Sequence, residues 1–459
     1  MKHKVESITP SLIVLLVAFA TGCDRHLADS REKKDNQPAI ADPCRLVLTP
    51  SDGATDLDKK VAAVQQRVRV SNASSNALEQ LGWLFVAKAR VSFDPGFYKL
   101  AEQCALCMEA RSGRSPEALL LRGHVLQNLH KFKEAEPVAQ ELVARRGLPF
   151  DFGLLGDVFM EQGRLDEALV AYQRMLDLRP DLHSYSRGAH VRWLKGDVEG
   201  AAELMSLAAS AATPLDTESA AWVNTRLAGY QFQLGLAAEA ERSCAAALGF
   251  QSNYPPGLLL RGRMLLADGK PECAVEALRL AAKMNPLPEY QWTLAEALRA
   301  TGREDQAASV ETQLRRHGAT TDPRTFALFL ATRGAASQAA VRLAKAELNS
   351  RQDVFTHDAL AWTLAAAGEW NEATVHVSQA LAEGTQDARL FLHAGIIYAK
   401  SGRIVEADRK LNLARGISHL LLPSEKSLLT QSLSSLQRMS TEPKNVNQKT
   451  KGKELVQHD

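Results

Sequence analysis

The chain has 459 residues, of which 45% are hydrophobic, 24% charged and 6% aromatic. This composition is typical of a globular protein and excludes a collagen-like, disordered or membrane-embedded chain. Lysine and arginine number 55 against 53 aspartate and glutamate, a net charge of +2, so no nucleic-acid partner is expected. Six cysteines are too few for a disulfide scaffold.

The amino terminus has the layout of a secretory signal. Lys2 and Lys4 precede an apolar run over residues 11–20, and small residues then lead to Cys23. The apolar run is about half of the ~20 residues that span a bilayer, which disfavours a transmembrane helix. The Ala-Thr-Gly before Cys23 resembles the lipobox of bacterial lipoproteins, although Ala20 stands where leucine is usual. The alternative is an ordinary cleaved signal followed by an unrelated cysteine.

The lipobox resemblance implies a signal peptide over residues 1–22 and a lipid-modified Cys23. Several acyl chains, at ~0.8 kcal/mol per buried CH₂, would hold the protein on the periplasmic side of the cell membrane or the outer membrane. Asp24 resembles the enterobacterial signal for inner-membrane retention, but the choice of membrane stays open. Polar residues without helical or strand period predict a flexible tether over residues 23–60. The polar tail, residues 438–459, is predicted to be disordered.

A repeat of about 34 residues fills the middle of the chain. Eight glycines recur at steps of 33, 39, 34, 33, 32, 34 and 34 residues, and each is followed five positions later by an alanine. The pairs are Gly163/Ala168, Gly196/Ala201, Gly235/Ala240, Gly269/Ala274, Gly302/Ala307, Gly334/Ala339, Gly368/Ala373 and Gly402/Ala407. We expect the connection near Thr213–Thr217 to absorb the five extra residues of the 39-residue step.

Each repeated residue has a mechanical role in a helical hairpin. A left-handed glycine ends the first helix, and the small alanine sits where the second helix crosses the first closely. In the same register, Gly156, Gly262 and Gly395 precede the turn glycines by seven residues, and Tyr172 and Leu278 follow their alanines by four. The pattern resembles the tetratricopeptide repeat, an antiparallel pair of helices.

The resemblance implies an all-α, right-handed superhelical solenoid of about ten helix-turn-helix units over residues 75–422. With capping helices, including one expected over residues 424–437, the solenoid covers residues 61–437. His130 and Ala135 hold the glycine and alanine positions in a weaker, earlier copy. Further segments, such as residues 178–185, 285–290 and 358–362, resemble those of secreted or lipidated bacterial tetratricopeptide proteins.

No motif points to catalysis, a metal or a cofactor, and the sequence therefore predicts a protein that is not an enzyme. Cys104 and Cys107 have the spacing of a redox or zinc pair, but core packing inside a second helix is favoured. Cys244 and Cys273 lie on adjacent second helices, and whether any disulfide forms stays open. His183 and His190 are about two helical turns, ~10.5 Å, apart, too far to share a metal ion.

The resemblance also indicates a groove, because the first helices of such repeats line a concave surface. The residues that the register places in it are His183, His190, Trp193, Trp222, Phe232, Trp292, Glu296, Arg299, Asp358 and Trp362. Aromatic anchors with polar neighbours suit an extended or helical peptide. The alternative is that a register error of one residue moves the aromatic side chains into the helix pairs, where they only pack.

The sequence predicts a membrane-anchored scaffold that binds a protein or peptide partner on the extracytoplasmic side. The alternative is a regulatory or sensor subunit of a membrane enzyme or secretion complex. The absence of a catalytic motif makes an enzyme the weakest of the three hypotheses.

Overall fold

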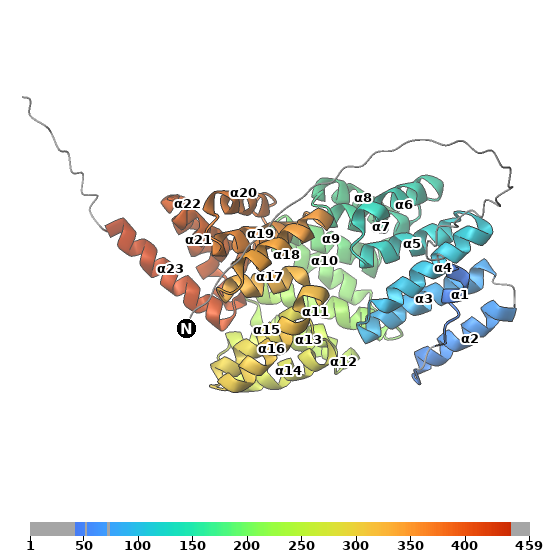
Figure 1. The fold of residues 1–459 in the computed structure, drawn as a ribbon, viewed down its shortest axis with the longest axis horizontal. Coiled ribbons are helices and arrows are strands. Elements are labelled where there is room, and N and C mark those ends of the chain that lie inside the picture. The colour runs from blue at the N-terminus through green and yellow to red at the C-terminus, as the bar shows by residue number, and fades with distance from the viewer. Residues whose placement is uncertain (1–41, 51–52, 71–73, 442–459) are drawn as a thin grey trace, which may run out of the picture. The chain divides into compact units, whose positions relative to one another are not determined.

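The computed structural model describes residues 42–50, 53–70 and 74–441, and the folded unit begins at Pro43. Within these ranges the regular structure is entirely helical (Figure 1). The amino-terminal half contains α1 (Pro43–Leu46), α2 (Asp56–Val70), α3 (Ser75–Ser92), α4 (Gly96–Ser112), α5 (Pro116–Asn128), α6 (Phe132–Arg145), α7 (Pro149–Glu161), α8 (Leu165–Leu178), α9 (Leu182–Leu194), α10 (Val198–Ser210), α11 (Thr217–Gln233) and α12 (Ala237–Phe250).

The second half continues the same pattern and ends in a longer helix. It contains α13 (Pro255–Ala267), α14 (Pro271–Met284), α15 (Pro288–Ala300), α16 (Glu304–Thr321), α17 (Pro323–Thr332), α18 (Ser337–Ser350), α19 (Val354–Ala366), α20 (Trp370–Ala380), α21 (Ala388–Lys400), α22 (Ile404–Gly416), a 3₁₀ turn η1 (Ser418–Leu420) and α23 (Pro423–Thr441). Ten packed helix pairs, from α3–α4 (unit 1) to α21–α22 (unit 10), confirm the predicted all-α solenoid. The expected capping helix over residues 424–437 lies within α23.

The turn between the two helices of a unit depends on a left-handed residue. All eight predicted turn glycines have positive φ, between 64° and 85°, and His130, at the glycine position of the weaker copy, has φ 57°. Seven of the eight partner alanines are fully buried; Ala339 is not, and the neighbouring Ala340 takes its place. A second left-handed residue, Ala336, lengthens this turn and shifts the helix by one position.

The hairpin crossings are as tight as the register predicts. A Cβ atom built on Gly156 would lie 2.4 Å from the Tyr172 ring, and one on Gly262 would lie 2.4 Å from Leu278. Real Cβ contacts are never so short, so any larger side chain would push the two helices of the unit apart.

The folded amino-terminal cap begins earlier than the sequence suggests. The predicted tether extends to residue 60, whereas α1 and the first turn of α2 already lie within that range, and Val47, directly after α1, is buried against the first unit. The Gln65 side chain donates to the carbonyl oxygens of Val47 (2.9 Å) and Thr49 (2.8 Å). The signal peptide, Cys23 and the first part of the tether lie outside the described residues, as does the tail beyond residue 441.

A disulfide joins Cys44 of α1 to Cys107 of α4, across 63 residues of sequence. Both Cys104 and Cys107 are buried in the core, as the favoured interpretation predicts, and Cys107 also forms the disulfide, which the sequence left open. Cys104 is a buried free thiol whose pKa burial raises well above the usual range. Cys244 and Cys273 are free thiols, one buried and one exposed.

The extra residues of the 39-residue step are not all absorbed by a loop. Helix α11 has 17 residues, whereas the first helices α9 and α13 have 13 each, so α11 is longer by 17 − 13 = 4 residues. These four residues add about one helical turn. The added turn is at its amino-terminal end, because α11 begins 18 residues before Gly235 and α9 begins 14 residues before Gly196.

The last units fold back against the middle of the solenoid, and we call this contact the seam (Figure 1). The backbone N–H of Gln352 donates to the Glu161 carbonyl oxygen at 3.1 Å, and Arg351 forms an ion pair with the Glu161 side chain. The Gln386 side chain donates to the Gly196 carbonyl oxygen at 2.8 Å, across 190 residues of sequence. Farther along, the Arg263 guanidinium donates to the Leu420 carbonyl oxygen at 2.9 Å.

Two turn glycines also lie at the seam, where the absence of a side chain leaves room for a backbone carbonyl group. A Cβ atom on Gly163 would lie 2.3 Å from the Gln352 carbonyl oxygen, and one on Gly196 would lie 2.4 Å from that of Gly384. Gly235 has nearly the same φ as Gly163, 76° against 75°, but nothing lies within 4 Å of its Cβ position. The two glycines therefore share the turn conformation and differ in the seam contact.

Gly163→Asn and Gly235→Asn should separate these two roles. Asparagine tolerates the left-handed conformation, so both variants bear a similar small backbone cost. Only Gly163→Asn also forces the seam apart, for an additional ~1–3 kcal/mol of lost stability. We expect a lower unfolding midpoint in urea for Gly163→Asn than for Gly235→Asn; equal midpoints would show that the seam does not constrain this turn.

Candidate functional site

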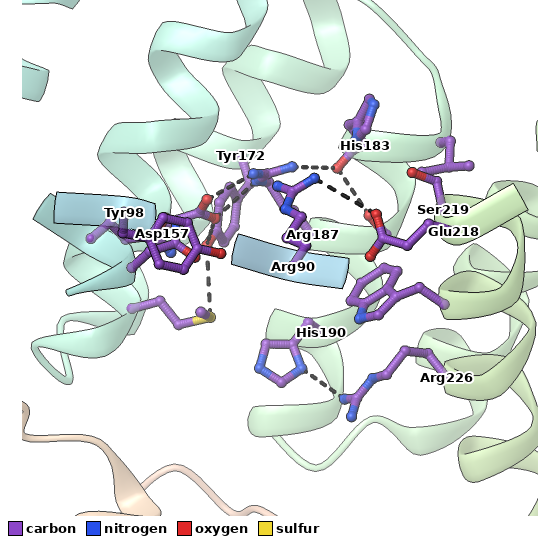
Figure 2. A pocket seen from close by; sticks show the side chains of 16 residues that line it. Arg90, Tyr98, Asp157, Tyr172, His183, Arg187, His190, Glu218, Ser219 and Arg226 are labelled. Carbon is purple, nitrogen blue, oxygen red and sulfur yellow. Dashed lines mark hydrogen bonds and ion pairs between the residues drawn. The ribbon is translucent and has the colours of Figure 1, made fainter. Parts of the chain in front are cut away.

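The inner surface of the amino-terminal units holds a pocket of about 520 Å³, which we call the arginine pocket (Figure 2). Three arginines line it: Arg90 from α3, Arg187 from α9 and Arg226 from α11. A second pocket of about 350 Å³, the aromatic pocket, is lined by Trp193, Trp222, Tyr230, Pro256, Leu259 and Leu260 among others. The two pockets share Trp222 and Arg226, so they form one continuous concavity.

Arg187 is fully engaged with Asp157 at the base of the arginine pocket. Its Nε and Nη2 atoms donate to the two carboxylate oxygens at 2.8 and 2.7 Å, and the Tyr172 hydroxyl donates to the same carboxylate at 2.9 Å. Burial alone would lower the pKa of Arg187, but the Asp157 carboxylate raises it above its ordinary value. This pair is a satisfied buried ion pair that supports the pocket.

Arg226 is held by neutral groups. Its Nη2 atom lies 3.1 Å from His190 Nδ1 and 3.1 Å from the Tyr230 hydroxyl oxygen. Its guanidinium carbon lies 5.7 Å and 5.2 Å from the ring centroids of Trp193 and Tyr230. Since arginine only donates, His190 Nδ1 accepts and the proton of the neutral imidazole is on Nε2. Desolvation, reinforced by the Arg226 charge, lowers the pKa of His190 to about 3.

An ion pair crosses the pocket between units that are distant in sequence. Arg90 Nη1 of unit 1 lies 3.8 Å from Glu218 Oε2 of unit 5, and both side chains are about two-fifths exposed. Glu218 stands on the added first turn of α11, which the Asp216 side chain caps by accepting from the Ser219 N–H at 3.1 Å. Desolvation raises the pKa of Glu218 although Arg90 acts in the opposite direction. We call this ion pair the Arg90–Glu218 clasp.

The structure brings four of the ten predicted groove residues into the concavity. His183, His190 and Trp222 line the arginine pocket, and Trp193 and Trp222 line the aromatic pocket. Trp222 is 36% exposed, the most accessible of the predicted tryptophans. That these residues bind a partner stays a prediction.

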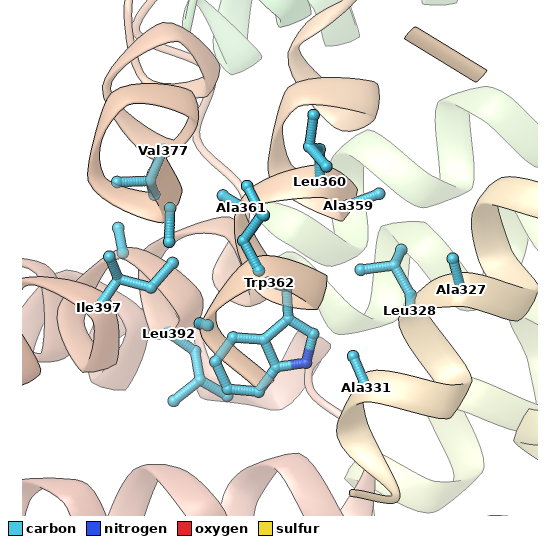
Figure 3. Packing of buried hydrophobic residues seen from close by; sticks show 14 of the residues in the cluster. Ala327, Leu328, Ala331, Ala359, Leu360, Ala361, Trp362, Val377, Leu392 and Ile397 are labelled. Atoms are coloured by element: carbon cyan, nitrogen blue, oxygen red, sulfur yellow. The ribbon is translucent and has the colours of Figure 1, made fainter. Parts of the chain in front are cut away.

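Five of the remaining six do not have the expected open position, because they are nine-tenths or more buried. They are Phe232, Trp292, Glu296, Asp358 and Trp362. Trp362 packs among the small and branched side chains of the core (Figure 3), stacks on His393 at 4.1 Å between centroids and donates to Thr332. For the aromatic residues of this set, the alternative interpretation describes the observed positions: their side chains pack in the core instead of lining an open groove.

The seam and α23 explain much of this burial. Ser424, at the start of α23, donates its N–H and hydroxyl to the Glu296 carboxylate at 3.0 and 2.7 Å. The sixth residue, Arg299, donates to Glu311 at 2.7 Å rather than to open solvent. In this part of the predicted groove, Glu296 is therefore covered by α23, and Arg299 is paired within its own unit.

Sequence reasoning missed all five charged residues of the arginine pocket, the three arginines together with Asp157 and Glu218. Arg187 lies four residues after His183, and Arg226 lies four residues after Trp222, so both share a helix face with a predicted groove residue. This spacing could have identified them. Arg90 gives no such signal, because its position depends on how unit 1 approaches unit 5.

The tetratricopeptide repeat model matches residues 120–183, 154–217 and 259–319. These segments therefore carry tetratricopeptide repeats. The matched segments cover units on both sides of the added turn in α11, and they agree with the helix pairs of the structure. No curated protein matches the sequence.

Solved structures that are similar to parts of this chain include three of low sequence identity. The Cut9–Hcn1 hetero-tetramer of the APC/C has 14% identity over 87% of this chain and 92% of that chain, with a TM-score of 0.33. PilF of Pseudomonas aeruginosa has 16% identity over 47% and 96%, with a TM-score of 0.38. A tetratricopeptide repeat protein from Parabacteroides merdae has 17% identity over 56% and 98%, with a TM-score of 0.32.

In residues 42–50, 53–70 and 74–441 no group of three or more histidine, cysteine, aspartate or glutamate side chains could hold a metal ion. In the same part of the chain no helix is long and apolar enough to cross a bilayer.

His190 should make the stability of the repeats depend on pH. Its pKa is about 3 in the folded protein and near 6.5 when unfolded, so the unfolded chain binds more protons between these values. Stability is therefore complete above pH ~6.5 and declines as the pH falls, by up to ~2 kcal/mol at pH ~5. Urea unfolding at both pH values should show this decline reduced in His190→Gln but retained in His317→Gln, an exposed control. An unchanged decline in His190→Gln would contradict the assignment.

Proposed function

We propose that the protein is a lipid-anchored tetratricopeptide scaffold on the extracytoplasmic side of a bacterial membrane. Its partner would be a protein or peptide bound in the arginine and aromatic pockets. The repeats themselves support the interaction role, since such units are typically non-catalytic scaffolds. A regulatory or sensor role would follow if the partner were a membrane enzyme or a secretion complex.

The observation that carries the proposal is the position of Trp222. It is a large aromatic side chain, 36% exposed, at the junction of two adjoining pockets on the inner surface. Aromatic residues in a partly enclosed concavity dominate the binding energy of protein interfaces. Polar and charged groups around it, such as Arg226 and Glu218, supply the orienting contacts that an apolar anchor lacks.

The location rests on two independent features. The lipobox resemblance at Cys23 implies a lipid anchor, and the Cys44–Cys107 disulfide suits an oxidising compartment such as the periplasm. Disulfides are rare in the cytosol because thiol reductants keep cysteines reduced.

Affinity capture from the native membrane tests the binding role. The parent protein should recover a defined partner, and Trp222→Ala should lose it while keeping its helicity by circular dichroism. Val170→Ala is a matched control, because Val170 is an exposed apolar residue on the second helix α8 and lines neither pocket. Equal recovery by Trp222→Ala would remove this concavity from the proposal.

Metabolic labelling with a fatty-acid analogue tests the anchor. The parent protein should incorporate the label and fractionate with membranes, because the Cys23 thiol is the attachment point. Cys23→Ser should abolish labelling and leave the precursor unprocessed, whereas Cys273→Ser, which removes an exposed cysteine of α14, should leave both unchanged. Labelling that persists in Cys23→Ser would refute the anchor.

A further inference from the structure

We propose that the arginine pocket recognises a carboxylate of a peptide partner, which replaces Glu218 at Arg90 and opens the Arg90–Glu218 clasp. This inference rests on the proposed function, since it names the chemistry of the partner that the concavity would bind.

The charge balance of the pocket favours an anion. Arg187 and Asp157 satisfy each other with two short hydrogen bonds, so neither is free for a ligand. The charged groups that remain are Arg90, Arg226 and Glu218, two cations and one anion. The uncompensated charge is therefore positive, and it lies inside a concavity where screening by water is weaker than on an open surface.

Of the two cations, Arg226 gives the stronger support for an anionic ligand. Among the residues that the structure describes, no carboxylate forms an ion pair with it, and its side-chain hydrogen-bonding partners are the neutral His190 and the Tyr230 hydroxyl. Contacts with the Trp193 and Tyr230 rings help to fix the orientation of its guanidinium plane. A guanidinium that is oriented in advance by neutral groups can bind a carboxylate with little loss of side-chain entropy.

The Arg90–Glu218 clasp is a pair that a ligand can replace. Its closest N–O distance, 3.8 Å, is too long for a hydrogen bond, and both side chains are partly exposed. Partly exposed ion pairs of this kind contribute little to the stability of the folded protein. A partner carboxylate that binds Arg90 in bidentate geometry would form shorter, charge-assisted hydrogen bonds and release Glu218 to solvent.

Helix α11 carries Glu218, Trp222 and Arg226 of the arginine pocket, and it is the first helix that the 39-residue step of the repeat lengthens. Glu218 stands in the added turn, Trp222 follows one helical turn later and Arg226 one turn after that, so all three share a face of α11. A first helix of 13 residues, as in α9 or α13, would begin after Glu218 and leave Arg90 without this partner. The 39-residue step in the sequence therefore supplies the acidic half of the clasp.

Fluorescence polarisation with defined peptides tests the proposal. The probe is a fluorescein-labelled, amidated hexapeptide, Gly-Ser-Trp-Glu-Glu-Gly, compared with versions that carry Gln-Gln or Lys-Lys in place of Glu-Glu. A fourth peptide, with Gln-Gln and a free carboxyl terminus, distinguishes a terminal carboxylate from an acidic side chain. We expect binding of the Glu-Glu peptide, the free-acid peptide or both to exceed that of the amidated Gln-Gln and Lys-Lys peptides.

Two substitutions should change the affinity for the acidic peptide in opposite directions. Arg90→Gln removes a ligand contact and should weaken binding roughly 3- to 5-fold, whereas Glu218→Gln removes the competing carboxylate and should strengthen it by a similar factor. Arg242→Gln, on the second helix α12 and 69% exposed, is the matched control and should change nothing. Circular dichroism and the unfolding midpoint confirm that all three variants are folded.

Several outcomes would overturn the inference. Weaker binding in Glu218→Gln together with preference for the Lys-Lys peptide would show that the pocket takes a cation. Equal binding of all four peptides, or binding of none, would show that a carboxylate is not recognised. The capture experiment with Trp222→Ala is independent of peptide charge, so the scaffold proposal can survive each of these results.

Discussion

Each helix pair of this protein can bury its apolar face only against a neighbouring pair, and the rest of the structure depends on that stacking. The close crossings at Gly156 and Gly262 set the geometry of single units, and the left-handed turn glycines fix how each second helix returns. The pockets exist because first helices from successive units stand side by side and present one face inward.

The seam adds a second kind of contact to this local stacking. It joins residues about 190 positions apart through carbonyl oxygens at turns, where only glycine leaves room for the backbone. The inner surface is divided: the amino-terminal units keep a concavity, whereas α23 packs against α15 of unit 7 and α21 of unit 10. Buried polar groups such as Glu296 and the His393–Asp358 pair belong to that packed region.

Sequence reasoning succeeded where the determinants are local. The turn glycines, the alanines at the crossings and the number of units all follow from spacing within one repeat, and each of these has a direct steric reason. Which groove residues stay open could not be read from that spacing. Trp222 and Trp292 both occupy first-helix positions, but whether a later segment covers them depends on contacts across many units.

Prediction and structure also differ at the amino-terminal cap and in the length of α11. There, too, composition and local spacing do not show the contacts that form. The polar stretch before residue 60 concealed α1 and the first turn of α2, because among its described residues only Val47 is a buried apolar side chain. The sequence near Thr213 does not indicate whether the five extra residues form a loop or extend a helix. The structure shows that most extend α11, and thereby place Glu218 opposite Arg90.

The disulfide between Cys44 and Cys107 also changes how the end of the array behaves. In a linear array, a terminal unit has one neighbour instead of two, so it frays first when the chain is stressed. Closing a loop of 63 residues removes about 4 kcal/mol of conformational entropy from the unfolded ensemble in the chain-entropy treatment. This stabilisation falls on the first unit, whose α3 carries Arg90. The oxidation state of one covalent bond thus decides how firmly one wall of the arginine pocket is held.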